Sequence, residues 1–178
     1  MSPKKIFFLV IFFVIPSLLF FFLRFFGKNE FEVKPLYEEG VPNPPPGCSY
    51  SYTPPYLIPD SVLRGGGDFN GFLVLSFSND ANHRKALDEI TYEFQSDPVK
   101  IKCFLLKAGG VQDKLIWEEV YLDQSLWGDL KKCVFLLSGE ETLVLLDQEK
   151  RIRGSYRGQD EEEIDRLRAE LAILLKKY

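Results

Sequence analysis

Residues 71–94 read GFLVLSFSNDANHRKALDEITYEF, and this stretch decides the fold. Its first part, residues 72–77, is nearly all apolar, as a strand covered on both faces must be. Asp80 is a suitable helix cap, and the residues after it repeat an apolar face at helical intervals. The members of that face are His83, Leu87, Ile90 and Phe94. The stretch therefore predicts a buried strand, a polar turn and an amphipathic helix.

The polar turn between strand and helix is the first place to look for function. Ligands of α/β proteins often bind where the carboxyl end of a strand meets the amino end of a helix. The residues at this junction are Asn79, Asp80, Ala81, Asn82 and His83. They include neither a cysteine pair nor a glycine-rich phosphate loop. The pattern thus indicates a fold more clearly than a reaction.

The residues after this stretch predict the rest of a small sheet. We expect strands at residues 99–106, 115–122, 142–146 and 152–156, and a short helix at residues 126–133. A last helix begins at a capping box formed by Asp160 and Glu163. Its apolar stripe consists of Ile164, Leu167, Leu171 and Leu174. This order predicts an α/β fold, a thioredoxin-like mixed sheet with flanking helices, over residues 60–178.

The amino-terminal part of the chain is strongly apolar. Residues 6–26 read IFFLVIFFVIPSLLFFFLRFF, and a helix of that length spans about 30 Å, the thickness of a bilayer core. The length favours an uncleaved transmembrane anchor over a signal peptide, whose apolar core is about 7–15 residues. Lys4 and Lys5 favour a cytoplasmic tail at residues 1–5. We therefore expect a single-pass membrane protein whose C-terminal domain is periplasmic or otherwise extracytoplasmic.

A proline-rich stretch, residues 27–59, separates the apolar segment from the domain. Eight of the eleven prolines lie between Pro35 and Pro59. Such a composition is typical of an extended spacer, and less often of a segment that binds a partner. Cys48 lies in this spacer, where it is expected to pair with another chain or to stay free.

The composition excludes several classes of function. A net charge of −4 gives no basic face for nucleic acid. Three widely spaced cysteines and one histidine make no zinc pattern, and we expect no cofactor. His83 is more simply interpreted as an inner-face helix residue than as a metal ligand, because metal sites need several convergent donors. A Cys103–Cys133 disulfide is conceivable outside the cytoplasm, although sequence alone does not fix their separation.

The C-terminal part resembles one known family. Residues 143–175, LVLLDQEKRIRGSYRGQDEEEIDRLRAELAILL, are similar to the matching segment of the Sco/SenC family. Members of that family are membrane-anchored, thioredoxin-fold copper chaperones of cytochrome c oxidase assembly. The shared features are a strand, an aspartate and turn, Ile-Arg-Gly, an aromatic residue, a glycine and an acidic run. The entry to the domain at Ile58, Pro59 and Asp60 is also similar.

The resemblance does not extend to the metal ligands of the family. The Cys-x3-Cys of Sco/SenC proteins would fall on Asn79 and His83, and their distal histidine near Gly139 or Glu140. Copper(I) prefers thiolate ligands, and this chain has none at those positions. The resemblance therefore implies a degenerate relative to which the copper function does not carry over.

Three hypotheses follow from these observations. The leading one is a membrane-tethered, non-catalytic module that binds a protein partner outside the cytoplasm, with oxidase assembly as the context that the resemblance supplies. The alternative is a thiol–disulfide oxidoreductase that uses Cys48 with Cys103 or Cys133, or a copper-binding protein centred on His83. A third is a purely structural envelope protein.

Overall fold

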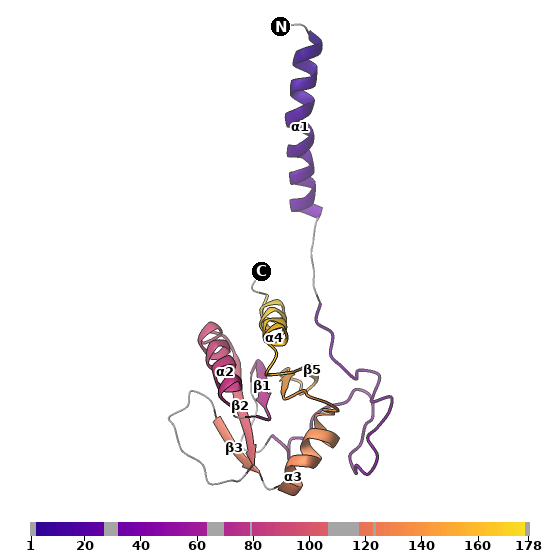
Figure 1. Ribbon diagram of the computed structural model, residues 1–178. Helices are drawn as coiled ribbons and strands as arrows, with labels where there is room; N and C mark the ends of the chain where they lie inside the picture. The colour runs from indigo at the N-terminus through magenta and orange to yellow at the C-terminus, as the bar shows by residue number, and fades with distance from the viewer. Residues whose placement is uncertain are drawn as a thin grey trace. The chain divides into compact units, whose positions relative to one another are not determined.

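The computed structural model describes residues 3–26, 32–63, 70–78, 80–106, 118–122 and 124–176. The chain forms two compact units, Met1–Glu32 and Val33–Tyr178. The elements in chain order are α1 (Pro3–Phe26), β1 (Phe72–Ser76), α2 (Ala81–Glu93), β2 (Val99–Leu106), β3 (Glu118–Leu122), α3 (Gln124–Asp129), the π-helical turn η1 (Leu130–Val134), β4 (Leu143–Leu146), β5 (Ile152–Tyr156) and α4 (Glu161–Leu174), as labelled in Figure 1.

The first unit consists of the helix α1, which is 24 residues long and contains Pro16. The hydroxyl of Ser17 donates to the carbonyl oxygen of Phe13 at 2.8 Å, so this polar group is satisfied one turn back along the helix. The structure does not describe the side chains at positions 6–10, 23, 25 and 26. Among the described residues, none of the helices is both long enough and apolar enough to cross a membrane.

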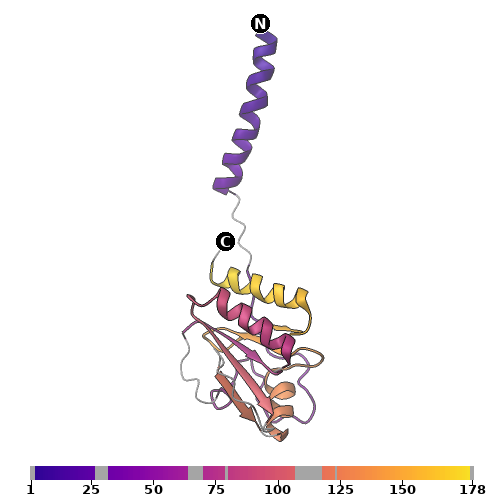
Figure 2. The ribbon, with the colours of Figure 1, turned by 60° about the vertical axis from the view of Figure 1, so that its left-hand side comes forward.

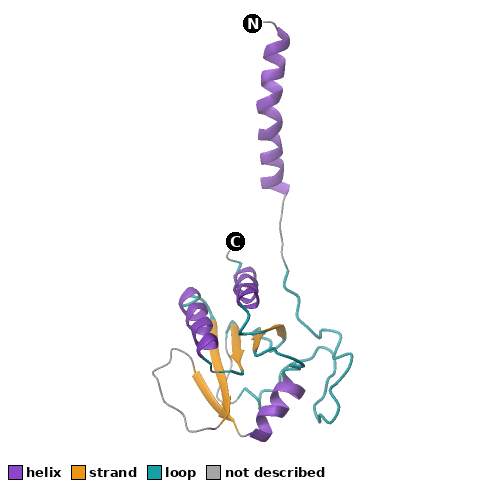
Figure 3. Ribbon diagram, in the orientation of Figure 1, coloured by secondary structure: helices purple, strands orange, loops and turns teal. Residues whose placement is uncertain are grey.

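The second unit contains a five-stranded sheet with the order β3-β2-β1-β4-β5. The neighbours β1, β2 and β3 run parallel, whereas β4 is antiparallel to β1 and β5 is antiparallel to β4. Figures 2 and 3 show α2 and α4 together on one face of this sheet. The strand directions, the α2 crossover and the final hairpin and helix form a thioredoxin-like α/β fold, as the sequence predicts.

The strand β1 lies at the centre of the sheet and is buried on both faces. Leu73 and Leu75 belong to the core cluster beneath α3 and η1, while Val74 belongs to the cluster beneath α2 and α4. All three have no exposed surface, and burying each stabilises the fold by roughly 1.5–3 kcal/mol. The continuous apolar run of the sequence is thus explained by two cores that share one strand.

The predicted elements are confirmed closely, with two differences. The strand expected at residues 115–122 is described from Glu118 onward, because residues 111–117 lie outside the described part. The short helix starts at Gln124 and ends in the π-helical turn η1. Single π turns of this kind are rare and are not encoded by a recognisable pattern.

The prediction of a spacer over residues 27–59 needs correction. Residues 33–59 belong to the same compact unit as the sheet, so the domain begins near Val33 and not at residue 60. Tyr56 and Ile58 are each only 2% exposed and lie in a core cluster. Backbone hydrogen bonds also join Leu36 to Ile152 and Ile58 to Lys150, at 2.6 and 3.0 Å. The reason is the apolar and tyrosine residues between the prolines, which an extended chain can still bury. We call residues 33–63 the proline-rich segment.

Candidate functional site

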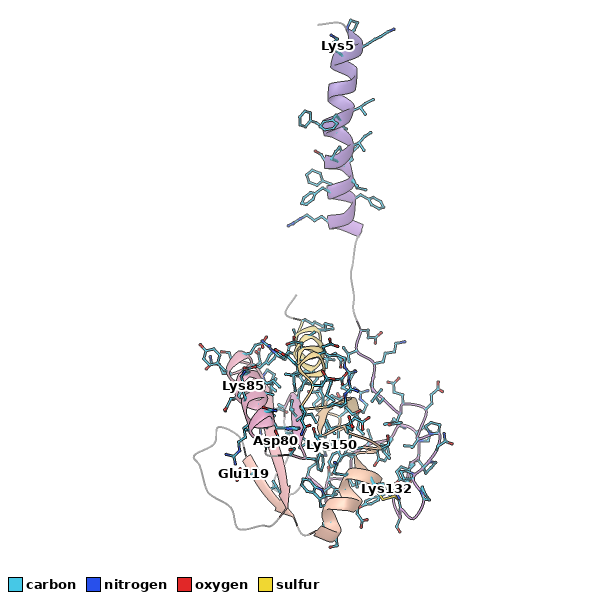
Figure 4. The ribbon with its side chains drawn as sticks, in the orientation of Figure 1. Lys5, Asp80, Lys85, Glu119, Lys132 and Lys150 are labelled. Carbon is cyan, nitrogen blue, oxygen red and sulfur yellow. A yellow bond between two sulfur atoms is a disulfide. The ribbon has the colours of Figure 1, made fainter. Side chains whose placement is uncertain are left out.

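The junction between β1 and α2 is organised by Asp80. Its backbone is extended, and its carboxylate accepts hydrogen bonds from the backbone N–H groups of Asn82 and His83, each at 3.0 Å. Ser78 adds a hydroxyl donor at 2.9 Å. These bonds satisfy two of the free N–H groups at the start of α2 and confirm Asp80 as the helix cap. Figure 4 labels Asp80 at this position.

His83 links this helix start to the β4–β5 hairpin. The imidazole has no exposed surface, and its Nδ1 lies 2.7 Å from Oδ2 of Asp80. Its Nε2 lies 2.6 Å from Oγ1 of Thr142, the residue before β4. The backbone N–H of Gly158, just after β5, donates to the same Thr142 oxygen at 3.1 Å. We call Asp80, His83, Thr142 and Gly158 the histidine clamp.

The charge of Asp80 sets the hydrogen positions in the clamp. Burial alone would raise the pKa of Asp80, but hydrogen bonds from the side chain and backbone of His83, from Ser78 and from Gln159 hold it well below its ordinary value. An ionised carboxylate can only accept, so Nδ1 of His83 carries a proton. In the neutral ring Nε2 then accepts, and the hydroxyl of Thr142 must donate to it. The side-chain polar atoms of Asp80, His83 and Thr142 thus all have hydrogen-bond partners inside the protein.

At Gly158 the histidine clamp leaves no room for a side chain. A Cβ atom placed there would overlap the imidazole ring of His83 and would lie 3.0 Å from Oγ1 of Thr142. Only glycine therefore lets the hairpin approach the helix this closely. Sequence reasoning identified His83 and Asp80 but missed Thr142 and Gly158, because positions 59 and 75 residues after His83 have no periodic relation to it.

The clamp has the order carboxylate, imidazole, hydroxyl that also occurs in hydrolytic triads. In such triads the base must reach a proton, and the hydroxyl must be accessible to the substrate that it attacks. Here His83 is fully buried, and the Thr142 oxygen also accepts from the N–H of Gly158. The arrangement joins α2 to the β4–β5 hairpin through contacts to both ring nitrogens of His83.

The structure describes two of the three other positions of the predicted degenerate site. Asn79 lies outside the described residues. Gly139 and Glu140 are exposed, and the N–H of Gly139 donates to Glu141 at 2.8 Å. Among the residues that the structure describes, no three His, Cys, Asp or Glu side chains are grouped to hold a metal ion. The distal contact to His83 comes instead from the nearby Thr142.

A polar groove of about 210 Å³ adjoins the clamp. Asn82, Lys85 and Glu89 of α2 line one side, and Gly158, Gln159 and Glu161 line the other. Gln159 reaches from this groove to Asp80, with 3.3 Å between Nε2 and Oδ2. The groove therefore meets the clamp at Gly158, which lines it, and at Asp80 through Gln159.

Cys48 and Cys133 lie at η1, which packs on the face of the sheet opposite to α2 and α4. Cys48 and Cys133 form a disulfide with 5.5 Å between their Cα atoms, across a sequence separation of 85. This corrects two expectations: Cys48 neither stays free nor pairs with another chain, and Cys133 does not pair with Cys103. The side chain of Cys103, within β2, lies outside what the structure describes. The pairing arises because the proline-rich segment folds back over η1, which the spacer interpretation did not foresee.

Comparison with known proteins finds distant structural likenesses without a match in sequence. The sequence matches no protein-family model and no curated protein. The chain is similar to the solved structure of BsSco, a member of the Sco family of cytochrome c oxidase assembly proteins, at 10% identity and a TM-score of 0.44, covering 62% of this chain and 83% of that one. It is also similar to Trgpx in its apo form, at 13% identity and a TM-score of 0.39, covering 82% and 97%. Likenesses this distant assign neither a family nor a function.

Proposed function

We propose that this chain is a thioredoxin-like binding module, tethered to a membrane, that engages a protein partner outside the cytoplasm without catalysing a reaction. The histidine clamp is the observation that carries this proposal. The junction where such folds place their chemistry is closed by mutual contacts of Asp80, His83 and Thr142 at 2.7 and 2.6 Å. A metal or substrate that binds the imidazole of His83 would have to break one of these contacts to a buried ring nitrogen, which costs free energy.

Two features support a place outside the cytoplasm. The Cys48–Cys133 disulfide favours an oxidising compartment, because cytosolic thiols are kept reduced. The apolar residues 6–26 favour a membrane tether, with Lys4 and Lys5 on the cytoplasmic side. Alkaline carbonate extraction of membranes tests the tether. We expect the full chain to remain in the membrane pellet and a chain that lacks residues 1–32 to be released. Release of the full chain would contradict the tether.

Respiratory-oxidase assembly is the context that we propose for this module. The similarity of residues 143–175 to the Sco/SenC segment supports this role. The rest of the sequence neither supports nor opposes it. Deletion of the protein in its own organism should lower the level of assembled oxidase, measured spectroscopically as haem in washed membranes. Normal oxidase levels in the deletion strain would contradict a role in respiratory-oxidase assembly.

Titration with copper(I) tests the absence of a metal site. The purified full chain in detergent is mixed with copper(I) in the presence of glutathione, and bound metal is measured after gel filtration. We expect no binding that outcompetes glutathione. Stoichiometric copper that is lost in a His83→Asn variant would contradict the proposal and favour a copper-binding function.

One observation favours a second function, thiol–disulfide exchange, and that is the disulfide itself. A catalytic cysteine needs a stabilised thiolate in a partly exposed, electropositive setting. Cys133 is only 5% exposed, and the single histidine of the chain is held within the clamp. An insulin-reduction assay with the full chain separates the two functions. Turnover that disappears in a Cys48→Ser variant would establish the oxidoreductase, and we expect none.

A further inference from the structure

The part of the proline-rich segment that carries Cys48 is a closed loop. Its ends meet where the N–H of Tyr56 donates to the carbonyl oxygen of Tyr37 at 3.1 Å. We call residues 38–55 the proline loop. Closed loops of this shape keep their base when their tip moves, because the base is a separate set of contacts.

The base of the proline loop is held firmly to η1 by tyrosine hydroxyls. Tyr56 donates to the carbonyl oxygen of Val134 at 2.7 Å, and Tyr52 donates to that of Cys133 at 2.8 Å. These carbonyls lie at the end of a helical element, where they need partners from outside the helix. Tyr56 is also 2% exposed within the core. The base thus stays attached without any help from the disulfide.

The tip of the loop, residues 42–49, is held differently. Its side chains are exposed or half-buried. Two contacts in the described structure tie the tip to η1. One is the Cys48–Cys133 disulfide, and the other is a hydrogen bond at 3.1 Å from Nζ of Lys132, labelled in Figure 4, to the carbonyl oxygen of Pro46. An exposed hydrogen bond of this kind stabilises by only about 1 kcal/mol. The disulfide is therefore the contact that decides the position of the tip.

We propose that the Cys48–Cys133 disulfide is a reversible redox latch on the tip of the proline loop, and that its reductant is a protein dithiol. Cys48 is half-buried at the surface, whereas Cys133 is 5% exposed, so attack falls on the sulfur of Cys48. A thiolate of the dithiol bonds to Sγ of Cys48, the Cys48–Cys133 bond breaks, and Cys133 leaves as a thiolate that takes a proton from water. The second thiol then displaces Cys48, which leaves two cysteine thiols in this chain and a disulfide in the reductant.

The effect of reduction is local, because the base contacts and both core clusters do not depend on the bond. Opening the latch lets residues 42–49 leave η1 while β4 and β5 keep their pairing. A redox latch in this sense controls only the position of the tip. A purely structural disulfide differs, because its loss would lower the stability of the whole compact unit. The proposal stands whether or not the module is catalytic.

Hydrogen exchange measured by mass spectrometry tests the latch. The full chain in detergent is incubated with reduced thioredoxin as the dithiol probe, and free thiols are counted by maleimide labelling. We expect two new thiols under native conditions. The tip has amide hydrogens at residues 43 and 47–49, because its other four positions are proline. These amides should then exchange roughly tenfold faster or more, and those of β4 and β5 should stay within about twofold. A Cys48→Ser, Cys133→Ser double variant should show the same exchange without any reductant.

A matched control removes the other tip contact. Lys132→Ala breaks the hydrogen bond to Pro46 and leaves the disulfide, so its tip should exchange about as slowly as the wild type. Three results would overturn the proposal. They are a disulfide that thioredoxin reduces only in denaturant, a reduced chain whose tip exchanges at the oxidised rate, and a reduced chain in which β4 and β5 also lose protection.

Discussion

His83 is the only histidine of the chain, and it lies in the one place where α2, β4 and the residues after β5 meet. Its two ring nitrogens face a carboxylate and a hydroxyl at 2.7 and 2.6 Å. A buried imidazole with both nitrogens satisfied stabilises the native state mainly through what its loss would leave unpaired. Replacement of single clamp residues therefore gives sharp predictions.

Substitution of His83 by alanine should be strongly destabilising. The change opens a cavity and leaves the hydroxyl of Thr142 without its acceptor, which together cost about 2–4 kcal/mol. Urea unfolding followed by tryptophan fluorescence measures the loss. Lys85→Ala on the same helix is the control, because the Lys85 side chain is 79% exposed and should change stability by less than about 0.5 kcal/mol. Equal midpoints for the two variants would show that the clamp contributes nothing.

The two glycines Gly158 and Gly128 give a matched pair. Gly158→Ala forces a methyl group into the His83 ring and should cost about 2–3 kcal/mol through overpacking and displaced hydrogen bonds. Gly128→Ala meets nothing within 4 Å and lies in α3, where alanine favours the helix by about 1 kcal/mol. Thermal unfolding should move the two variants in opposite directions. A harmless Gly158→Ala would refute the close approach of hairpin and helix.

The acid stability of the protein should depend on Asp80. Its pKa is lower in the folded state than the ordinary value of 3.8, so the unfolded state binds a proton first as the pH falls. The stabilisation is complete above pH 3.8 and is lost as the pH drops toward the folded value. Asp80→Asn should be less stable than the wild type at pH 7, and the gap should narrow steadily below pH 4. Parallel stability curves from pH 7 to pH 2 would contradict this assignment.

Most of the secondary structure could be predicted from local sequence patterns. The apolar run of β1 and the spacing of His83, Leu87 and Ile90 in α2 were sufficient to predict both elements and their buried faces. The capping box of α4 was half right: Asp160 accepts from Glu162 at 3.1 Å, but Glu163 turns to Arg166 at 2.7 Å. The N–H of Asp160 is instead taken by the carbonyl oxygen of Arg157, which leaves Glu163 without its expected donor.

Contacts between distant elements were only partly anticipated: Cys48 with Cys133 was one of two pairings of the oxidoreductase alternative, and Thr142 was not expected to contact His83. Thr142 reaches His83 across 59 positions, and Cys48 reaches Cys133 across 85. Neither distance carries a period, a motif or a composition signal. Both contacts follow from how the elements pack, and packing depends on the summed shapes of many side chains. The sequence therefore predicted the fold, but it did not predict which residues contact His83 in the candidate site.

The tyrosines that fix the proline-rich segment to η1 give an element-level prediction. Tyr56→Phe removes the hydroxyl that caps the carbonyl of Val134 and should cost roughly 1–2 kcal/mol at pH 7. Burial raises the pKa of Tyr56 above its ordinary value of 10.0, so the unfolded state ionises first as the pH rises. The wild type should thus lose stability above about pH 10, and the variant should lose less of it. Urea unfolding at pH 8 and pH 10.5 measures how much stability each protein loses between the two pH values. An equal loss in the wild type and in Tyr56→Phe would contradict a buried Tyr56 hydroxyl.

At the scale of the whole molecule, the folded domain begins earlier than the composition of the chain suggested. Composition alone suggested a stiff spacer before residue 60, yet the proline-rich segment supplies Tyr56, Ile58 and Leu63 to the core. Proline fixes the backbone in extended geometry without preventing neighbouring side chains from packing. A proline-rich stretch that contains several tyrosines is better interpreted as a segment that packs onto the domain.

Two truncations test this boundary. A chain that starts at residue 33 should unfold in one cooperative transition, because it keeps the whole compact unit. A chain that starts at residue 60 loses Tyr56 and Ile58 from a core cluster, together with the Cys48–Cys133 disulfide. Burial of a large apolar side chain stabilises a fold by roughly 1.5–3 kcal/mol. We expect the shorter chain to lack a cooperative thermal transition by circular dichroism. Equal transitions for both chains would restore the spacer interpretation.

The most direct test of the closed junction is the nitrogen-15 NMR spectrum of the single histidine, recorded on the untagged full chain in detergent with labelled imidazole. The account predicts a ring protonated at Nδ1, with Nε2 accepting from Thr142, and a spectrum that does not change when copper(I) is added. A ring protonated at Nε2, or an imidazole signal that shifts or broadens with one equivalent of copper(I), would contradict it.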